Sequence, residues 1–186
     1  TYNFVGTGST HLTLDNSNNT AGITAGGGLN TFNVPVVLTA PGAAIQVTND
    51  ILGNVSSIVN MAAPISGTNA NLSISGSGKV ILSATNTYSG TTSIAVGTTL
   101  QIGNGGTTGT FGAGNVTANG TIIVNRSDGT TAAPATIGNT IVGSGGLTIN
   151  GTGVTELTSV NSFTGTVNIN SGRLMVGAGN TVSHNT

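Results

Sequence analysis

The chain has 186 residues, of which only 4% are charged, and it carries a formal net charge of −1 and no cysteine. Soluble domains usually contain about 25% charged residues, so this surface is unusually neutral and lacks the basic patch that nucleic acids or anionic membranes require. The absence of cysteine excludes disulfides and thiolate metal sites.

The composition favours a folded β protein over a disordered chain. Gly, Thr, Asn and Ser make up more than half of the residues, a bias that disordered tracts share. However, 36% of the residues are hydrophobic, and many of these are the β-branched Val and Ile. No apolar run reaches the roughly 18 residues that a membrane-spanning helix needs. We therefore expect one all-β domain over residues 1–186.

Short apolar runs with a period of two follow one another along the chain, whereas helical periodicity is almost absent. Clusters of Gly, Asn and Asp, such as those at 15–19 and 143–146, separate the runs and indicate turns. In chain order, the runs predict strands at Leu12–Leu14, Phe32–Leu38, Ile45–Val47, Leu72–Ile74, Val80–Leu82, Leu100–Ile102, Ile122–Val124, Leu147–Ile149, Val167–Ile169 and Leu174–Val176.

One irregular phrase occurs twice in the chain, at a constant offset. Residues 76–97 read GSGKVILSATNTYSGTTSIAVG, and residues 151–172 read GTGVTELTSVNSFTGTVNINSG. The best-matched cores, 76–103 and 151–177, lie within repeat copies of about 29–103 and 104–177. The positions that recur are predicted to be structural: Gly76, Gly78, Leu82, Asn86, Tyr88, Gly90, Gly97, Gly151, Gly153, Leu157, Asn161, Phe163, Gly165 and Gly172.

Self-similarity at a fixed period is typical of a solenoid. A unit of this size would contain three or four coils of roughly 20–25 residues, so the chain would form about seven to nine coils. Parallel strands in successive coils would pair about 4.8 Å apart. Gly and Asn suit the corners, and Thr suits exposed strand positions. Because the chain begins and ends within strand-like sequence, we expect a fragment of a longer rod.

The alternation within the repeats predicts which side chains face the interior. Glu156 aligns with Ile81, and a lone glutamate should face solvent. The inward positions are then expected to be Val80, Leu82, Thr92, Ile94, Thr155, Leu157, Val167 and Ile169.

Two further expectations concern the turn that both copies share. Tyr88 and Phe163 are expected to cover the edge of the core, with stacking on a ligand as the alternative. Asn86 and Asn161 suggest an amide ladder, if they stack directly.

The repeated residues resemble the autotransporter-associated β-strand repeat, which occurs in passenger domains of type V secreted proteins. The parts of that family's phrase correspond here to Gly76–Gly78, Val80–Leu82, Asn86–Thr91, Thr92–Val96 and Leu100–Gly103. The resemblance implies a right-handed parallel β-helix that is exported through the outer membrane and displayed at the cell surface. It also implies anchoring in the outer membrane through a region that is not in this chain.

Groups suited to catalysis or metal binding are few and scattered. The acids are Asp15, Asp50, Asp128 and Glu156. Glycosidases require two facing carboxylates and pectin-type lyases require an acidic calcium site, and no local motif here supports either. His11 and His184 are isolated, which disfavours a metal site. We expect no catalytic residue, no metal and no cofactor, and therefore no enzyme.

Two other features have simple structural interpretations. The segment NRSDGT at 125–130 predicts a turn in which Arg126 and Asp128 pair, with a receptor-binding loop as the alternative. Ice binding would need a Thr-x-Thr motif at one position in successive coils, and the Thr pairs do not recur at one coil spacing.

The leading functional hypothesis is a non-enzymatic stalk in a bacterial surface adhesin of the autotransporter type. The alternative is a self-associating subunit of an extracellular fibre or biofilm matrix, since an open solenoid end presents unpaired strands. The expected partners are a second copy, or a host or cell-surface ligand outside this segment. Binding to nucleic acid and direct insertion into a membrane are not expected.

Overall fold

The computed structural model describes residues 2–4, 12–14, 21–39, 42–48 and 57–179. All regular elements in these ranges are short strands, and every strand pair is parallel. Within the same ranges, no helix is long and apolar enough to cross a membrane. The prediction of an all-β parallel solenoid is therefore confirmed.

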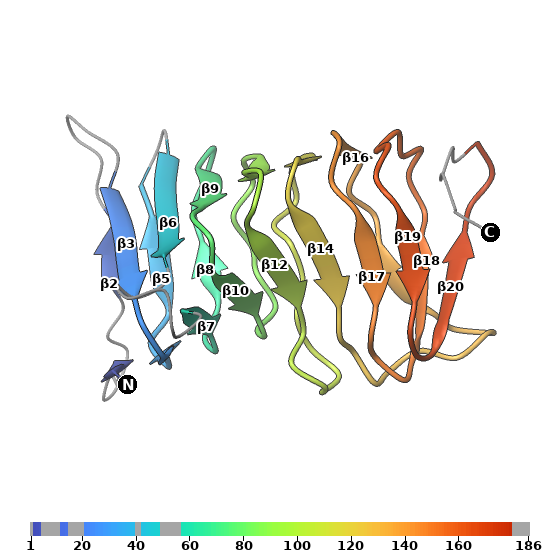
Figure 1. The fold of residues 1–186 in the computed structure, drawn as a ribbon, viewed down its shortest axis with the longest axis horizontal. Helices are drawn as coiled ribbons and strands as arrows, with labels where there is room; N and C mark the ends of the chain where they lie inside the picture. Colours follow the sequence, from blue (N-terminus) through green and yellow to red (C-terminus); the bar gives the residue numbers. More distant parts are fainter. Residues whose placement is uncertain (1, 5–11, 15–20, 40–41, 49–56, 180–186) are drawn as a thin grey trace.

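The longest sheet, which we call face 1, runs along the whole solenoid (Figure 1). Its eight strands, in the order in which they pair, are β1 (Tyr2–Phe4), β4 (Leu29–Phe32), β7 (Ile58–Met61), β10 (Lys79–Leu82), β12 (Thr99–Ile102), β14 (Thr121–Val124), β17 (Leu147–Ile149) and β19 (Val167–Ile169).

Between one face 1 strand and the next, the chain passes over two further faces. Face 2 consists of two three-stranded sheets: β2 (Leu12–Leu14), β5 (Val36–Leu38) and β8 (Ile65–Ser66), then β15 (Ala135–Ile137), β18 (Val154–Leu157) and β20 (Arg173–Val176). Face 3 consists of six strands: β3 (Ala21–Gly26), β6 (Gly42–Thr48), β9 (Asn71–Ser75), β11 (Thr92–Ile94), β13 (Val116–Ala118) and β16 (Ile141–Val142).

The eight strands of face 1 bound seven turns, the lower end of the expected range. Tyr2 pairs with Asn30 and Asn30 with Val59, whereas Val59 pairs with Val80 and Val80 with Leu100. The first two turns therefore take up more of the chain than the next two, and they exceed the expected coil length. Face 3 is wider there, because β3 and β6 have six and seven residues, whereas β11 has three.

Inward side chains from the three faces form one continuous hydrophobic core. The expected alternation is confirmed for Val80, Leu82, Thr92 and Ile94, which are buried, and for Thr155 and Leu157. Glu156 lies on the outward side and is partly exposed. Ile81 also lies on the outward side of its strand, yet it is only 7% exposed.

Two of the expected inward residues lie on the last face 1 strand. Val167 and Ile169 align with Leu147 and Ile149, which are buried, so they continue the inward columns. Ile169 is nevertheless 54% exposed. Among the described residues, β19 is the end strand of its sheet, so nothing described stacks on it from the following turn.

The single strand predicted over Phe32–Leu38 was wrong. The structure has two strands here, β4 and β5, on different faces, separated by a corner at 33–35. Proline at position 35 cannot donate to a sheet ladder, and it therefore suits the corner better than a strand interior.

Candidate functional site

The turn around Asn86 bonds three successive coils together. It lies on face 2, between β10 and β11. The Asn86 Oδ1 accepts a hydrogen bond from the Ile65 N–H of the preceding coil, at 2.8 Å. The Asn86 Nδ2 donates to the Thr110 carbonyl of the following coil, at 2.7 Å, and the Thr110 Oγ1 accepts from the Asn86 N–H. One buried side chain thus satisfies backbone groups above and below it.

The second copy repeats this arrangement towards its preceding coil. The Asn161 Oδ1 accepts from the Ile141 N–H at 2.7 Å, and its Nδ2 donates to the Ser159 carbonyl at 2.7 Å. Asn161 is fully buried. The suggested amide ladder between Asn86 and Asn161 is wrong. The two side chains lie on different faces of the solenoid, and their amide groups bond mainly to backbone groups.

The aromatic residues of the two turns belong to the core. Tyr88 is fully buried and Phe163 is 2% exposed, so neither ring offers a face to a ligand, and the alternative of ligand stacking is wrong. The Tyr88 hydroxyl and the Thr92 hydroxyl share a hydrogen bond of 2.7 Å. Burial raises the pKa of the Tyr88 hydroxyl above its ordinary value, although this hydrogen bond acts in the opposite direction.

Two pairs of equivalent glycines meet the same physical requirement in both copies. A Cβ built on Gly90 would lie 2.3 Å from the Ala70 carbonyl oxygen, and one built on Gly165 would lie 2.4 Å from the Gly145 backbone. Only a residue without a side chain allows coils to approach this closely. Gly97 and Gly172 have φ values of 80° and 65°, a left-handed conformation that favours glycine.

The remaining predicted repeat positions lie around these turns. Leu82 and Leu157 are fully buried at the ends of β10 and β18. The other predicted glycines lie in the corners that precede these strands: Gly76, Gly78, Gly151 and Gly153.

The two copies occupy different faces of the solenoid. In the first copy, β9, β10, β11 and β12 lie on faces 3, 1, 3 and 1. Their counterparts β17, β18, β19 and β20 lie on faces 1, 2, 1 and 2. The copies are therefore separated by three full turns plus one further face. The repeat is consequently a local unit that fits more than one side of the solenoid.

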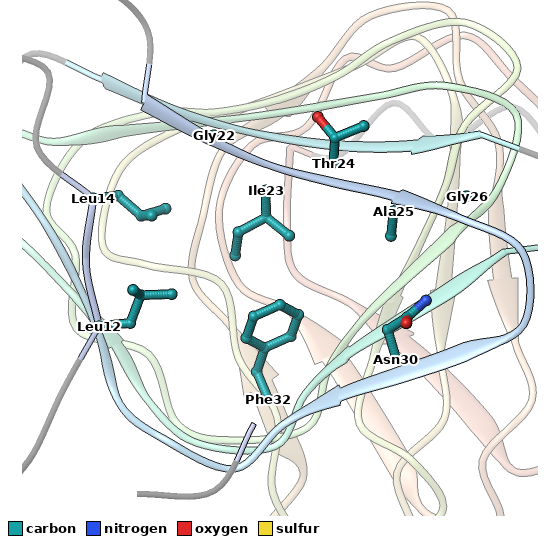
Figure 2. A pocket seen from close by; sticks show the side chains of 9 residues that line it. All are labelled: Leu12, Leu14, Gly22, Ile23, Thr24, Ala25, Gly26, Asn30 and Phe32. Atoms are coloured by element: carbon teal, nitrogen blue, oxygen red, sulfur yellow. The ribbon is translucent and has the colours of Figure 1, made fainter. Parts of the chain in front are cut away.

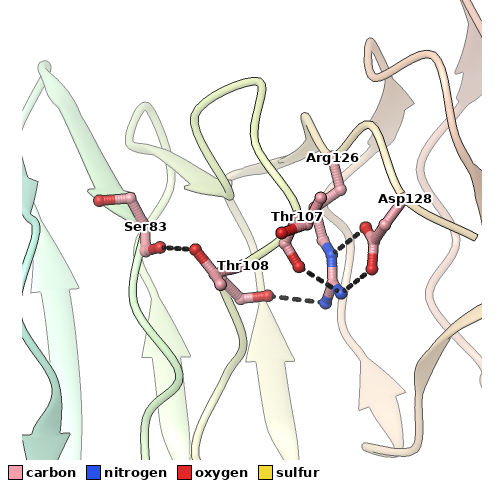
Figure 3. Close-up of polar contacts among 6 residues, drawn as sticks. Ser83, Thr107, Thr108, Arg126 and Asp128 are labelled. Carbon is pink, nitrogen blue, oxygen red and sulfur yellow. Dashed lines mark hydrogen bonds and ion pairs between the residues drawn. The ribbon is translucent and has the colours of Figure 1, made fainter.

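A second cluster of polar contacts joins two loops at the corner between faces 1 and 2 (Figure 3). The Arg126 guanidinium donates to both carboxylate oxygens of Asp128, at 2.9 and 2.5 Å, and to the Thr107 and Gly109 carbonyls. The hydrogen bonds from Arg126 are the main reason why the pKa of the Asp128 carboxyl lies below its ordinary value. The predicted pairing of Arg126 with Asp128 is confirmed.

The other titratable groups considered in the sequence are dispersed. Asp15, Asp50, His11 and His184 lie outside the described residues. Glu156 lies on β18, whereas Asp128 lies one turn earlier, in the loop between β14 and β15. Within the ranges that the structure describes, no group of three or more His, Cys, Asp or Glu side chains is placed to hold a metal ion.

Sequence reasoning missed two features. Thr110 bonds to Asn86 through both its hydroxyl and its carbonyl, but nothing in the sequence around position 110 resembles the repeat. Asn30 is only 6% exposed and lines a cavity at the N-terminal end of the core (Figure 2). The alternation in Leu29–Phe32 signals this position, because it places Asn30 on the same side of the strand as Phe32.

Comparison with known protein families gives two matches within the chain. The passenger-associated-transport-repeat family matches residues 75–102 and 147–176, which include the two asparagine–aromatic turns. No curated protein and no solved structure matches the chain. The matched repeats are those predicted from the recurring phrase, and they are typical of secreted proteins at the cell surface. Residues 75–102 and 147–176 therefore match the passenger-associated-transport repeat, a repeat of autotransporter-type passenger segments.

Proposed function

We propose that this segment is a non-enzymatic stalk in a cell-surface adhesin. The observation that carries the proposal is the place of the shared repeat residues. Asn86, Tyr88, Asn161 and Phe163 are all buried, and the two asparagines bond to the backbone of neighbouring coils. What the two copies share is therefore contact between coils, which is what an extended rod requires.

The mechanism we propose is stepwise folding during export. Each completed coil presents unpaired backbone groups to the next coil, and the Oδ1 of the incoming asparagine accepts a hydrogen bond from one backbone N–H of the previous coil. Most contacts are between neighbouring coils, so folding can propagate along the axis as the chain emerges. The finished rod would hold a distal binding region away from the cell.

The two copies lie on different faces of the solenoid, which supports a mechanical role for the repeat and argues against a regular row of binding sites. Equivalent outward positions, such as Ser73 and Thr148, lie on faces 3 and 1. A ligand-binding residue repeated at this offset would consequently point in a different direction in each copy. We place the protein outside the cell, anchored in the outer membrane through a region that is not in this chain, and we place ligand recognition outside this segment.

Surface display of the complete protein tests this proposal. The Asn86→Ala/Asn161→Ala double variant should lower the amount of protease-resistant protein at the surface of intact cells. The matched control is Asn170→Ala, since Asn170 is exposed and bonds to the Asn150 side chain at 2.8 Å. Normal, protease-resistant display of the double variant would contradict the proposed role of the repeats.

A second candidate function is self-association into an extracellular fibre. Face 3 favours it, because the aligned outward residues Ser73, Ser93 and Thr117 are small and uncharged and form one row across the sheet. Lateral contact between two copies there would desolvate no charge. Electron microscopy distinguishes the two functions: lateral bundles would support the fibre, and discrete rods at high concentration would contradict it.

A further inference from the structure

A cavity of about 450 Å³ lies inside the first turn, at the N-terminal end of the core. Figure 2 shows Leu12 and Leu14 on one side of this space, Ile23 and Ala25 on another, and Phe32 and Asn30 on the third. These side chains come from all three faces of the solenoid. The space is partly open, lies at the N-terminal end of the core and is distinct from the asparagine–aromatic turns.

The space arises from a long perimeter lined by small side chains. The first two turns, which end at Asn30 and Val59, take up more of the chain than the next two, which end at Val80 and Leu100. β3 reads AGITAG, so Ile23 is the only large side chain that this strand contributes. A concave, mainly apolar space of this size is the kind of place where a small ligand can fit.

Asn30 is a polar residue at the start of a column that is apolar in the next three turns. It pairs with Val59, and the column continues through Val80 and Leu100, which are all fully buried. The Asn30 Nδ2 reaches the Gly27 carbonyl at 3.4 Å, longer than a usual hydrogen bond. In the described part of the chain, no hydrogen bond to its Oδ1 is found. A buried carboxamide with such weak partners calls for an explanation.

We propose that the cavity binds a neutral, mainly apolar small molecule with one hydrogen-bonding group, which pairs with the Asn30 carboxamide. No charged side chain lines the cavity, and an ionised group would be costly there without a counterion. A carboxamide both donates and accepts, so it suits a hydroxyl group. Long-chain alcohols have this chemistry. The inference does not depend on the mechanical role proposed above.

Displacement of a fluorescent probe tests the site. N-phenyl-1-naphthylamine, which is neutral and brightens in apolar surroundings, should bind saturably to the protein and be displaced by 1-decanol. Asn30→Leu should weaken the binding of decanol about fivefold, the effect of one lost hydrogen bond, and leave displacement by decane unchanged. Thr31→Leu is the matched control, because Thr31 lies on the same strand and points to the opposite side.

Variants that fill the cavity provide the second part of the test. Ala25→Leu should abolish saturable probe binding, whereas Ala95→Leu, at an exposed position, should not. Circular dichroism checks that the strand signal is retained, and the smaller Ala25→Val substitution replaces Ala25→Leu if it is not. Absence of saturable binding to the unmodified protein, or unchanged affinity in the filled variant, would overturn the proposal.

Discussion

At the scale of single residues, the two buried asparagines explain why the repeat retains this residue type. A parallel solenoid pairs its backbone along the axis, but the chain must leave the strand conformation at the turn, where ladder bonds are interrupted. The carboxamide replaces those bonds, since it offers both an acceptor and a donor to backbone groups. Aspartate lacks the donor and leucine lacks both, so neither would satisfy the backbone of the neighbouring coils.

Replacing Asn86 with alanine should destabilise the protein by roughly 2–4 kcal/mol. The substitution leaves the buried Ile65 N–H and the Thr110 carbonyl without this partner, and each unsatisfied group costs about 1–3 kcal/mol. Asn170→Ala removes an exposed side-chain pair and should cost less than about 1 kcal/mol. Urea denaturation measures the free energy of unfolding of both variants. Equal losses would show that the buried hydrogen bonds of Asn86 stabilise the protein no more than the exposed pair does.

Acid should destabilise the protein through Asp128. The Arg126 hydrogen bonds hold its folded-state pKa below the ordinary value of 3.8 that the unfolded chain retains. A carboxylate of this kind stabilises the folded state above the unfolded-state pKa, and this contribution is lost as the pH falls through the folded-state pKa. The urea concentration at the unfolding midpoint should therefore decrease as the pH is lowered below about 4. The decrease should be less steep in Asp128→Asn. Parallel profiles for the two proteins would contradict this role.

At the scale of elements, corners constrain the sequence more tightly than strands do. The strands tolerate different residues at equivalent outward positions, such as Lys79 and Val154. The corners require glycine where two backbones touch, because any side chain would force the coils apart. This difference explains why glycine spacing was the clearest signal of the repeat, whereas the two-residue strands β8 and β16 gave no periodic signal.

Gly90→Ala should destabilise the protein by about 1–3 kcal/mol, the usual cost of overpacking. Its Cβ would lie 2.3 Å from the Ala70 carbonyl oxygen, which belongs to the preceding coil. Gly106→Ala is the matched control, because a Cβ there meets nothing within 4 Å and its φ is not in the left-handed region. Thermal unfolding compares the two variants, and a neutral Gly90→Ala would show that the coils can separate at no cost.

At the scale of the whole molecule, the repeat builds a rod although its two copies lie on different faces. Leu12–Leu14 and Leu147–Ile149 form strands with the predicted bounds, since alternation and nearby turn residues define them locally. The rotation between the copies was not predictable, because it depends on how many residues each corner absorbs. The loop at 126–134 lengthens one turn, and no local pattern indicates that length. The cavity beside Asn30 was hidden for the same reason.

Native-state hydrogen exchange tests the central claim, that each asparagine secures the coil before it regardless of the face. The amides of Ile65 and Ile141 should be protected in the unmodified protein. Asn86→Ala should speed exchange at Ile65 by about tenfold, and Asn161→Ala should do the same at Ile141, each leaving the other amide protected. Unchanged exchange at these amides in both variants would contradict the account.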